Sequence, residues 1–273
     1  MSIASINFYA DSLGQRADLH VVLPEYPAQR APSGPYRTVY DRARRFPVVY
    51  LLNGYTGDYT DWLTMLPLER FVTESGIAAV VPSGANTWYE DIRGGMQMRT
   101  FITEELPAAA EAFFPLADTA DRRFIAGISM GGRGAAMLSA ACPDTYRAAA
   151  CLSAPLLFGQ IAAAAGCTGA AQQRLCDSLA AAQGGRDAEA LEYPALVAAQ
   201  RRRGLTPPET LYLMGENDPF FASQYPPLQR LAAAGELPLQ MHSYPGQQHD
   251  FAFWQPAAQE MFRWLGERLP SIT

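Results

Sequence analysis

The sequence contains no lysine, so all 21 basic side chains of the 273-residue chain are arginines. Schiff-base chemistry, a serine–lysine dyad, a pyridoxal-phosphate anchor and a P-loop each need a lysine amine, and all four are therefore excluded. The formal net charge is −6, whereas a nucleic-acid binder needs a basic face. We expect no nucleic-acid partner.

Targeting and metal-binding patterns are also missing. The N-terminal stretch lacks the basic start and apolar core of a signal peptide, and no apolar run is long enough to span a membrane, so a cytoplasmic location is predicted. The four cysteines have neither C-x-x-C spacing nor neighbouring histidines, so we expect no metal site and no cofactor. Reduced thiols are the default in the cytoplasm, but a disulfide between Cys167 and Cys176 stays open.

Short apolar runs alternate along the chain with longer segments of helical periodicity. The predicted strands are residues 19–23, 48–52, 78–81, 124–126, 149–153, 210–214 and 239–244. The predicted helices are residues 62–74, 99–114, 132–141, 226–234 and 255–269. Because the strands are continuously apolar, we expect both of their faces to be buried. This favours the α/β class, with a mostly parallel central sheet flanked by helices.

One interval breaks this alternation. Residues 154–208 contain no convincing strand and are rich in Ala, Gln and Gly. A structureless loop of that length is unusual in a compact domain, so we expect a largely helical, cap-like insertion between two sheet strands. The sequence has no internal repeat and no linker, which predicts a single domain over residues 1–273.

A serine lies between glycines where a predicted strand meets a predicted helix. The segment reads FIAGISMGGRGAAML, with Ser129 at the centre of G-x-S-x-G. In α/β-hydrolases this motif places the nucleophile on a tight strand-to-helix turn, where larger flanking side chains would collide with the neighbouring strand and helix. The motif alone is common by chance, but its context here predicts Ser129 as the nucleophile rather than a plain turn residue.

The chain has only three histidines from which a general base can be chosen. His20 precedes the predicted nucleophile, where this fold does not place the base, and His242 lies inside a predicted strand. His249 follows the last predicted strand, in the loop sequence PGQQHDFAFW. We therefore predict His249 as the base.

The acid that orients this base is expected after its own strand. The segment TLYLMGENDPFF offers Glu216 and Asp218. Asp218 is the predicted acid, since the order Ser129, Asp218, His249 is that of α/β-hydrolases. Glu216 is interpreted as a loop carboxylate and Asp250 as a helix-entry residue.

Two backbone amides are expected to bind an oxyanion. One is that of Met130, which directly follows the predicted nucleophile at a helix N-terminus. The other is that of Tyr55, in the loop after an early strand that reads VVYLLNGYTGDYTDW. The alternative is that Asn53 and Gly54 form only a turn.

With these motifs, the chain resembles the esterase D / tributyrin esterase family of α/β-hydrolases, which includes feruloyl esterases, S-formylglutathione hydrolases and mycolyltransferases. The resemblance covers nearly the whole chain: the opening segment INFYADSLGQRADLHVVLPE is similar to the family's first hairpin, and GENDPFF and GQQHDFAFW are similar to its acid and histidine loops. It implies the same triad and the same two oxyanion amides. One departure is Asn53, where relatives usually carry His or Asp before the oxyanion glycine.

The leading functional hypothesis is a serine carboxylesterase that hydrolyses short-chain acyl or aryl esters, of the acetyl or feruloyl type, through an acyl-enzyme. The alternatives are a thioester hydrolase acting on S-formylglutathione, an acyltransferase, and an inactive hydrolase fold used as a binding module. Four aromatic residues near the motifs are candidates for substrate contact, although such residues more often belong to the core: Trp88, Phe220, Phe221 and Trp254. The expected partner is a small-molecule ester, and whether the chain forms a homo-oligomer is left open.

Overall fold

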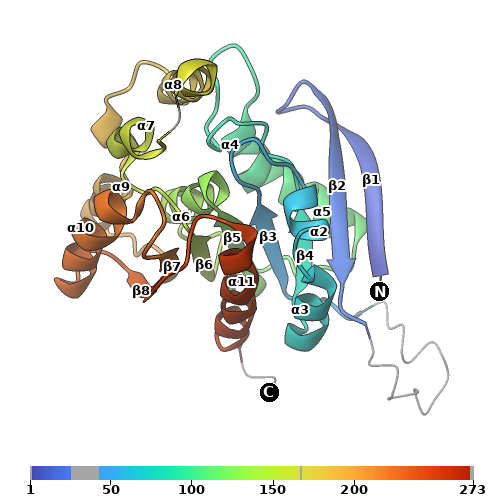
Figure 1. Ribbon diagram of the computed structural model, residues 1–273. Coiled ribbons are helices and arrows are strands. Elements are labelled where there is room, and N and C mark those ends of the chain that lie inside the picture. The colour runs from blue at the N-terminus through green and yellow to red at the C-terminus, as the bar shows by residue number, and fades with distance from the viewer. Residues whose placement is uncertain (1, 26–42, 167, 271–273) are drawn as a thin grey trace.

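The computed structural model describes residues 2–25, 43–166 and 168–270. Within these residues, eight strands form one sheet in the order β1-β2-β4-β3-β5-β6-β7-β8 (Figure 1). The strands are β1 Ser2–Ala10, β2 Gln15–Leu23, β3 Val48–Leu52, β4 Ala78–Val81, β5 Arg123–Ile128, β6 Ala148–Leu152, β7 Thr210–Gly215 and β8 Leu239–Tyr244. Strands β3 to β8 are mutually parallel, whereas β1 and β2 form an antiparallel hairpin that joins the sheet through β4. The predicted mostly parallel sheet is confirmed.

Helices cover both faces of this sheet. The α-helices are α2 Thr60–Leu63, α3 Leu68–Ser75, α4 Met98–Thr100, α5 Leu106–Phe113, α6 Met130–Ala141, α7 Ile161–Ala164, α8 Gly169–Gln183, α9 Tyr193–Arg202, α10 Phe221–Ala233 and α11 Phe251–Gly266. A π-helix, η1 Phe101–Glu105, joins α4 to α5, and the short 3-10 helices are η2 Ala120–Arg122, η3 Phe158–Gln160 and η4 Ala188–Leu191.

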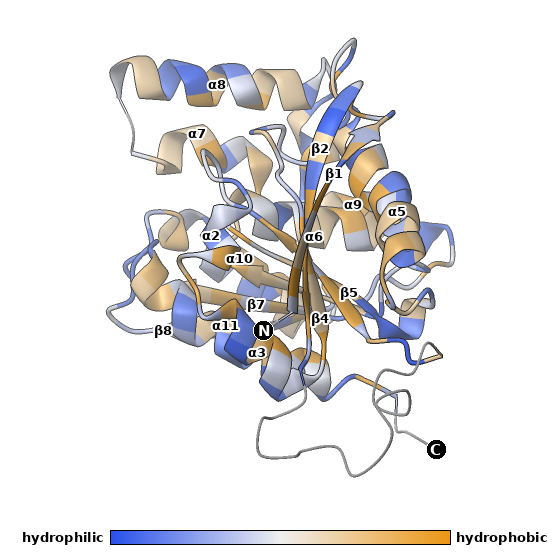
Figure 2. Cartoon of the chain, turned by 90° about the vertical axis from the view of Figure 1, so that its right-hand side faces the viewer, coloured by the Kyte–Doolittle hydropathy of each residue, from blue (hydrophilic) through white to orange (hydrophobic). Residues whose placement is uncertain are grey.

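Alternate residues of the central strands enter two separate cores. In β3, Val48, Tyr50 and Leu52 pack in the core beneath α5, α6 and α9, whereas Val49 and Leu51 pack in the core beneath α3 and α11. All five side chains are fully buried, because successive side chains of a strand point to opposite faces and helices cover both. Figure 2 shows hydrophobic residues along the inner strands and hydrophilic residues on helices such as α8 and α11.

Strand β1 is absent from the strands predicted by hydrophobic pattern. It forms one edge of the sheet, and its residues alternate between exposed and half-buried, so it lacks the continuous apolar run of the inner strands. The family resemblance did imply an opening hairpin. The turn of this hairpin is held by Glu105 of η1, whose carboxylate accepts hydrogen bonds from the backbone amides of Asp11 and Ser12 at 2.7 and 2.9 Å.

Two predicted helices differ from the observed ones for reasons of proline chemistry. The helix expected over residues 62–74 is divided into α2 and α3, since Pro67 disfavours helical backbone in the preceding residue and is the N-cap of the second helix. The helix expected over residues 99–114 is present, but a π-helical turn precedes Pro107. Proline has no N–H for the helix ladder and its ring crowds an earlier carbonyl, and a wider turn accommodates both effects.

The interval between β6 and β7 is helical and contains η3, α7, α8, η4 and α9. Helices α7 and α8 lie at the end of the molecule toward which the parallel strands point (Figure 1). None of the helices in the described ranges is both long and apolar enough to cross a membrane. The open question of a Cys167–Cys176 disulfide falls outside the described residues, which omit residue 167.

Candidate active site

Ser129 is the single residue between β5 and α6. Its backbone has φ 53° and ψ −117°, a left-handed conformation that is uncommon for any residue other than glycine. Its amide donates to the Leu152 carbonyl of β6 at 2.8 Å. The chain therefore turns sharply at Ser129 and is held in that turn by the neighbouring strand.

Two glycines make this turn sterically feasible. A Cβ atom at Gly127 would overlap the backbone of Gly131, and a Cβ atom at Gly131 would overlap the Leu52 carbonyl of β3. Helix α6 consequently begins in direct backbone contact with the ends of β3 and β5. The flanking glycines of the G-x-S-x-G motif are required by close approach, as the motif predicts.

Ser129, His249 and Asp218 form one chain of hydrogen bonds. The His249 Nε2 atom lies 3.0 Å from the Ser129 Oγ atom, and its Nδ1 atom lies 2.7 Å from Asp218 Oδ2. Asp218 follows β7 and its side chain is fully buried, while His249 follows β8 and is 20% exposed. The three residues are 31 and 120 positions apart in sequence, and the parallel strands bring them together at one edge of the sheet.

Other candidate acids and bases lie elsewhere. Glu216 accepts a hydrogen bond from Ser243 at 2.9 Å, and Asp250 caps α11 by accepting from the Phe253 amide at 3.2 Å. His20 bonds to Ser5 Oγ at 2.8 Å, and burial lowers the pKa of its imidazole. The Nδ1 atom of His242 lies 2.8 Å from a carboxylate oxygen of Glu260. Among the three histidines, only His249 contacts Ser129.

Two of the four candidate aromatic residues pack against the His249 ring. The rings of Phe220 and Trp254 each form an edge-to-face pair with the imidazole, with centroid distances of 5.3 and 5.1 Å. Trp254 is itself held by a hydrogen bond from Nε1 to Ser153 Oγ at 3.0 Å. These rings limit the rotation of the imidazole between Ser129 and Asp218.

The other two aromatic candidates lie farther from the imidazole. Trp88 stacks on Tyr55 at 5.8 Å between ring centroids and donates from Nε1 to Ser178 of α8 at 3.0 Å. Phe221 stacks on Tyr225 within α10. Trp88 thus connects the loop after β3 with the helical segment between β6 and β7.

The two predicted oxyanion donors belong to segments next to Ser129. Met130 is the first residue of α6, and the loop carrying Tyr55 follows β3, where a Cβ built on Gly54 would lie 3.7 Å from the Ser129 Cβ. Within the described part of the chain, neither amide donates to a protein acceptor. Both amides are therefore available to a bound group.

Arg133, one turn into α6, was not singled out from the sequence. Its side chain is fully buried and donates to the carbonyls of Trp88 and Leu191 at 3.2 and 3.0 Å. Glu90 lies 3.5 Å from it and also pairs with Arg186 at 3.2 Å. Burial lowers the pKa of the Arg133 guanidinium, and Glu90 opposes that shift. The available signal was a lone charge among the small residues of GGRGAAML.

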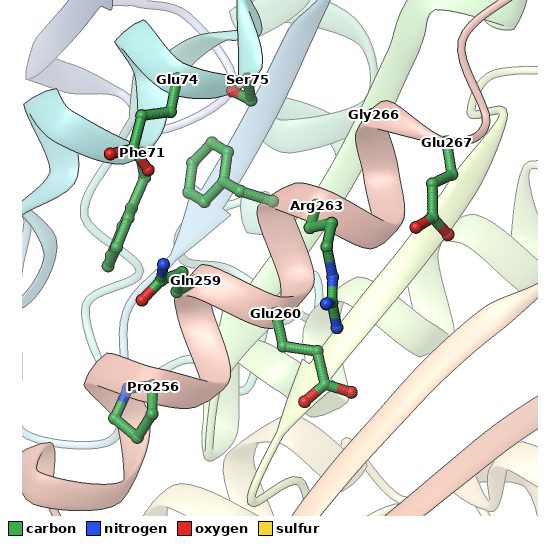
Figure 3. Close-up of a pocket in the computed structure, with 10 residues that line it drawn as sticks. Phe71, Glu74, Ser75, Pro256, Gln259, Glu260, Arg263, Gly266 and Glu267 are labelled. Atoms are coloured by element: carbon green, nitrogen blue, oxygen red, sulfur yellow. The ribbon is translucent and has the colours of Figure 1, made fainter.

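A separate hollow of about 680 Å³ lies between α3 and α11 (Figure 3). Its lining includes Phe71, Glu74 and Arg263, and it contains none of the three residues hydrogen-bonded around Ser129. The described residues hold no group of three or more His, Cys, Asp or Glu side chains arranged to bind a metal.

The fold and this arrangement define the class of the protein. A mostly parallel sheet with helices on both faces, and a Ser–His–Asp chain assembled after β5, β8 and β7, is the α/β-hydrolase fold. Residues 12–265 match the model of the Esterase family, whose description is "Putative esterase". The chain belongs to this family, and the resemblance to esterases identified from the motifs is confirmed.

Relatives and solved structures agree with this membership. The acetyl esterase of Caldicellulosiruptor saccharolyticus is 28% identical over 163 residues, and the match covers 59% of this chain and 59% of that protein. A substrate-bound fluorophosphonate-binding serine hydrolase of Staphylococcus aureus has a TM-score of 0.81 at 21% identity, covering 97% of this chain and 98% of that chain. An S-formylglutathione hydrolase of the same organism has a TM-score of 0.77 at 21% identity, covering 97% and 100%. At these identities the structural matches establish the fold.

The contact at Gly131 predicts a large effect of one added methyl group. We expect Gly131→Ala to push α6 away from the Leu52 carbonyl and to destabilise the fold by about 1–3 kcal/mol or more. Gly266→Ala is the matched control, because a Cβ there meets no atom within 4 Å. Urea unfolding of both variants measures the difference, and equal midpoints would contradict the close contact.

The burial of Arg133 predicts that its carboxylate partner is needed for stability. We expect Glu90→Gln to destabilise the fold by about 3 kcal/mol, since it removes the carboxylate 3.5 Å from a buried guanidinium and leaves only the weaker interaction with Glu192. Glu74→Gln is the control: Glu74 pairs with Arg70 at the surface, where both side chains are more than half exposed, and should change stability by less than about 1 kcal/mol. Equal losses in chemical denaturation would argue against the buried pair.

Proposed function

We propose that this chain is a serine carboxylesterase that hydrolyses short-chain acyl or aryl esters through an acyl-enzyme. The observation that carries the proposal is the continuous hydrogen-bond chain from Ser129 Oγ through His249 to Asp218, with distances of 3.0 and 2.7 Å. Membership of the Esterase family supports the reaction type. The strained backbone at Ser129 supports its role, because such strain concentrates at functional sites.

In the first half of the reaction, His249 Nε2 takes the proton from Ser129 Oγ as that oxygen attacks the ester carbonyl carbon. The carbonyl oxygen gains negative charge and accepts hydrogen bonds from the Tyr55 and Met130 amides. When the tetrahedral intermediate collapses, the bond to the alcohol oxygen breaks and His249 delivers its proton to that oxygen. An acyl-serine and a free alcohol result.

In the second half, water replaces the alcohol. His249 takes a proton from water as its oxygen attacks the acyl carbon, and then returns that proton to Ser129 Oγ as the carboxylic acid leaves. Asp218 keeps Nδ1 of the imidazole as a hydrogen-bond donor and stabilises the imidazolium that forms twice per turnover. Every proton in the cycle is therefore exchanged among Ser129, His249, water and the leaving alcohol.

The contacts of residues 154–208 support the proposal that the substrate is small. Helix α8 meets Trp88 through Ser178, and Trp88 in turn stacks on Tyr55, the residue proposed to supply an oxyanion amide. The Arg133 side chain reaches Leu191 of the same segment and lies 4.8 Å from the Phe158 ring centroid. We infer that this segment acts as a cap and restricts the length of the acyl or aryl group that reaches Ser129.

Substitution of the proposed nucleophile tests the mechanism. We expect Ser129→Ala to lower kcat on p-nitrophenyl acetate by about 10⁴- to 10⁶-fold and to abolish labelling by a fluorophosphonate probe. Ser139→Ala is the control, because Ser139 is also buried in α6 but bonds only to the Ala136 carbonyl. Retained turnover or labelling in Ser129→Ala would refute the mechanism, and an unreactive parent chain would indicate a binding module.

A substrate panel tests the proposed range. We expect kcat/KM to be highest for acetate, butyrate or feruloyl esters and to fall at least about tenfold for a twelve-carbon acyl chain, because a pocket distinguishes each methylene by about 1–3 kcal/mol. S-formylglutathione and an added acceptor alcohol complete the panel. A much higher kcat/KM for S-formylglutathione would indicate a thioester hydrolase, and dominant transfer to the alcohol would indicate an acyltransferase.

A further inference from the structure

Asn53 is a fully buried polar residue at the junction between β3 and the loop that carries Tyr55. Its Nδ2 group donates to the carbonyls of Gly54 and Gly57, both at 2.8 Å. Its Oδ1 atom accepts from the Gly84 amide at 2.8 Å and from the Tyr89 hydroxyl at 3.1 Å. A primary amide has two N–H donors and an oxygen with two lone pairs, so every hydrogen-bonding position of this side chain is used.

The surrounding backbone determines which way this amide points. The Gly84 amide can only donate, and the Gly54 and Gly57 carbonyls can only accept. A neutral imidazole offers one donor and one acceptor, and a carboxylate offers acceptors alone. Neither can replace all four bonds. The asparagine is therefore matched to a loop that presents two carbonyls on one side and two donors on the other.

Tyr89 connects this loop to the helix that follows Ser129. Its ring is buried between Gly84 and Gly134 of α6, where a Cβ atom at either glycine would crowd the ring. Its single hydroxyl proton is shared between the Asn53 carbonyl and Oδ1, each 3.1 Å from the hydroxyl oxygen. Burial holds the pKa of this hydroxyl well above its ordinary value, so it remains a donor. Asn53 and Tyr89 together join the Tyr55 loop to α6.

We propose that Asn53 and Tyr89 are positioning residues that hold the loop of residues 53–57 so that the Tyr55 amide points at the developing oxyanion. This inference rests on the proposed esterase mechanism, in which the Tyr55 and Met130 amides act together. An amide displaced from such a site lowers turnover by about 10²–10³-fold. The two residues touch neither the substrate nor the reacting atoms and act through the backbone that they hold.

In the variant Asn53→Asp, the position of this loop is expected to depend on pH. An ionised carboxylate would face the Gly54 and Gly57 carbonyl oxygens and repel them, whereas the neutral acid can still donate one hydrogen bond. The titratable described residues that face this position are Tyr89, which stays neutral, and Asp61 of α2, which bonds to the Gly54 backbone. Burial and the negative Asp61 raise the pKa of the introduced carboxyl. The loop is expected to keep its shape at acidic pH and to lose it as the carboxyl ionises.

The test measures kcat and KM for p-nitrophenyl acetate with the parent chain and Asn53→Asp, from about pH 5.5 to about pH 9. We expect the ratio of variant to parent kcat to fall at least about tenfold as pH rises, with KM changed less than about threefold. Taking the ratio removes any pH dependence that the two chains share. A ratio that is independent of pH and close to one would overturn the proposal.

Asn86→Asp is the matched control on the segment that packs against this loop. Asn86 Oδ1 only accepts a hydrogen bond, from the Thr56 amide at 2.6 Å, and a carboxylate does this equally well. Its kcat ratio is expected to stay constant with pH. A fall equal to that of Asn53→Asp would mean that any new negative charge near the loop has this effect, and it would overturn the specific role of Asn53.

Tyr89→Phe provides a second variant that keeps the ring in place. We expect it to lower kcat about tenfold at unchanged KM and at every pH, because one of the four bonds to Asn53 is lost. If Asn53→Asp is unfolded at the assay temperature, by circular dichroism, this variant decides: an unchanged kcat overturns the proposal. Failure of the proposed mechanism is distinguishable, since Ser129→Ala would then be as active as the parent chain.

Discussion

The start of α6 lies against the ends of β3 and β5 with no space for a side chain at Gly127 or Gly131, and the other parts of the site are arranged around that contact. Close approach forces the left-handed backbone of Ser129, at a cost of order 1–3 kcal/mol. It also brings the start of the loop after β3, at Asn53, against Gly131. The sheet supplies the packing that keeps this strained turn in place: β3, β5 and β6 are buried almost throughout.

Much of the fold and the central residues of the site were predictable from sequence, because their signals are local. The inner strands appear in the sequence as continuous apolar runs. The glycines on either side of Ser129 appear there because the backbone contacts leave no room for a Cβ atom. The Ser129, Asp218, His249 order is a property of chain topology, so it also appears in sequence. By contrast, edge strand β1 has no continuous apolar run, and the division of residues 62–74 into two helices depends on the local effect of Pro67.

Features that depend on contacts between distant segments were not predictable in the same way. Arg133 meets carbonyls 45 and 58 residues away, and nothing in its neighbourhood in sequence identifies those partners. Asn53 was visible in the sequence as a residue of interest, but two of its four side-chain hydrogen bonds come from Gly84 and Tyr89, and the return of that segment to the β3 loop is a tertiary event. Buried polar groups must find partners, yet a sequence does not say which ones.

Strained backbone occurs both at Ser129, which was predictable from local sequence, and in segments that only the tertiary structure brings together. Residues with positive φ that are not glycine occur at Ser129, in the Tyr55 loop at Thr56, and in the segment packed on that loop at Ala85, Asn86, Trp88 and Tyr89. Such conformations persist only where surrounding contacts determine them fully, and here those contacts include the buried hydrogen bonds of Asn53 and Arg133 and the exposed bond between Asn86 and the Thr56 amide. The frame that presents the reacting groups is therefore rigid on both sides of Ser129. The helical segment between β6 and β7 is tied to this frame through the side chains of Trp88, Arg133 and Gln224. Under the proposed role of this segment as a cap, substitutions in α7 and α8 would therefore change substrate size more than the proton-transfer geometry.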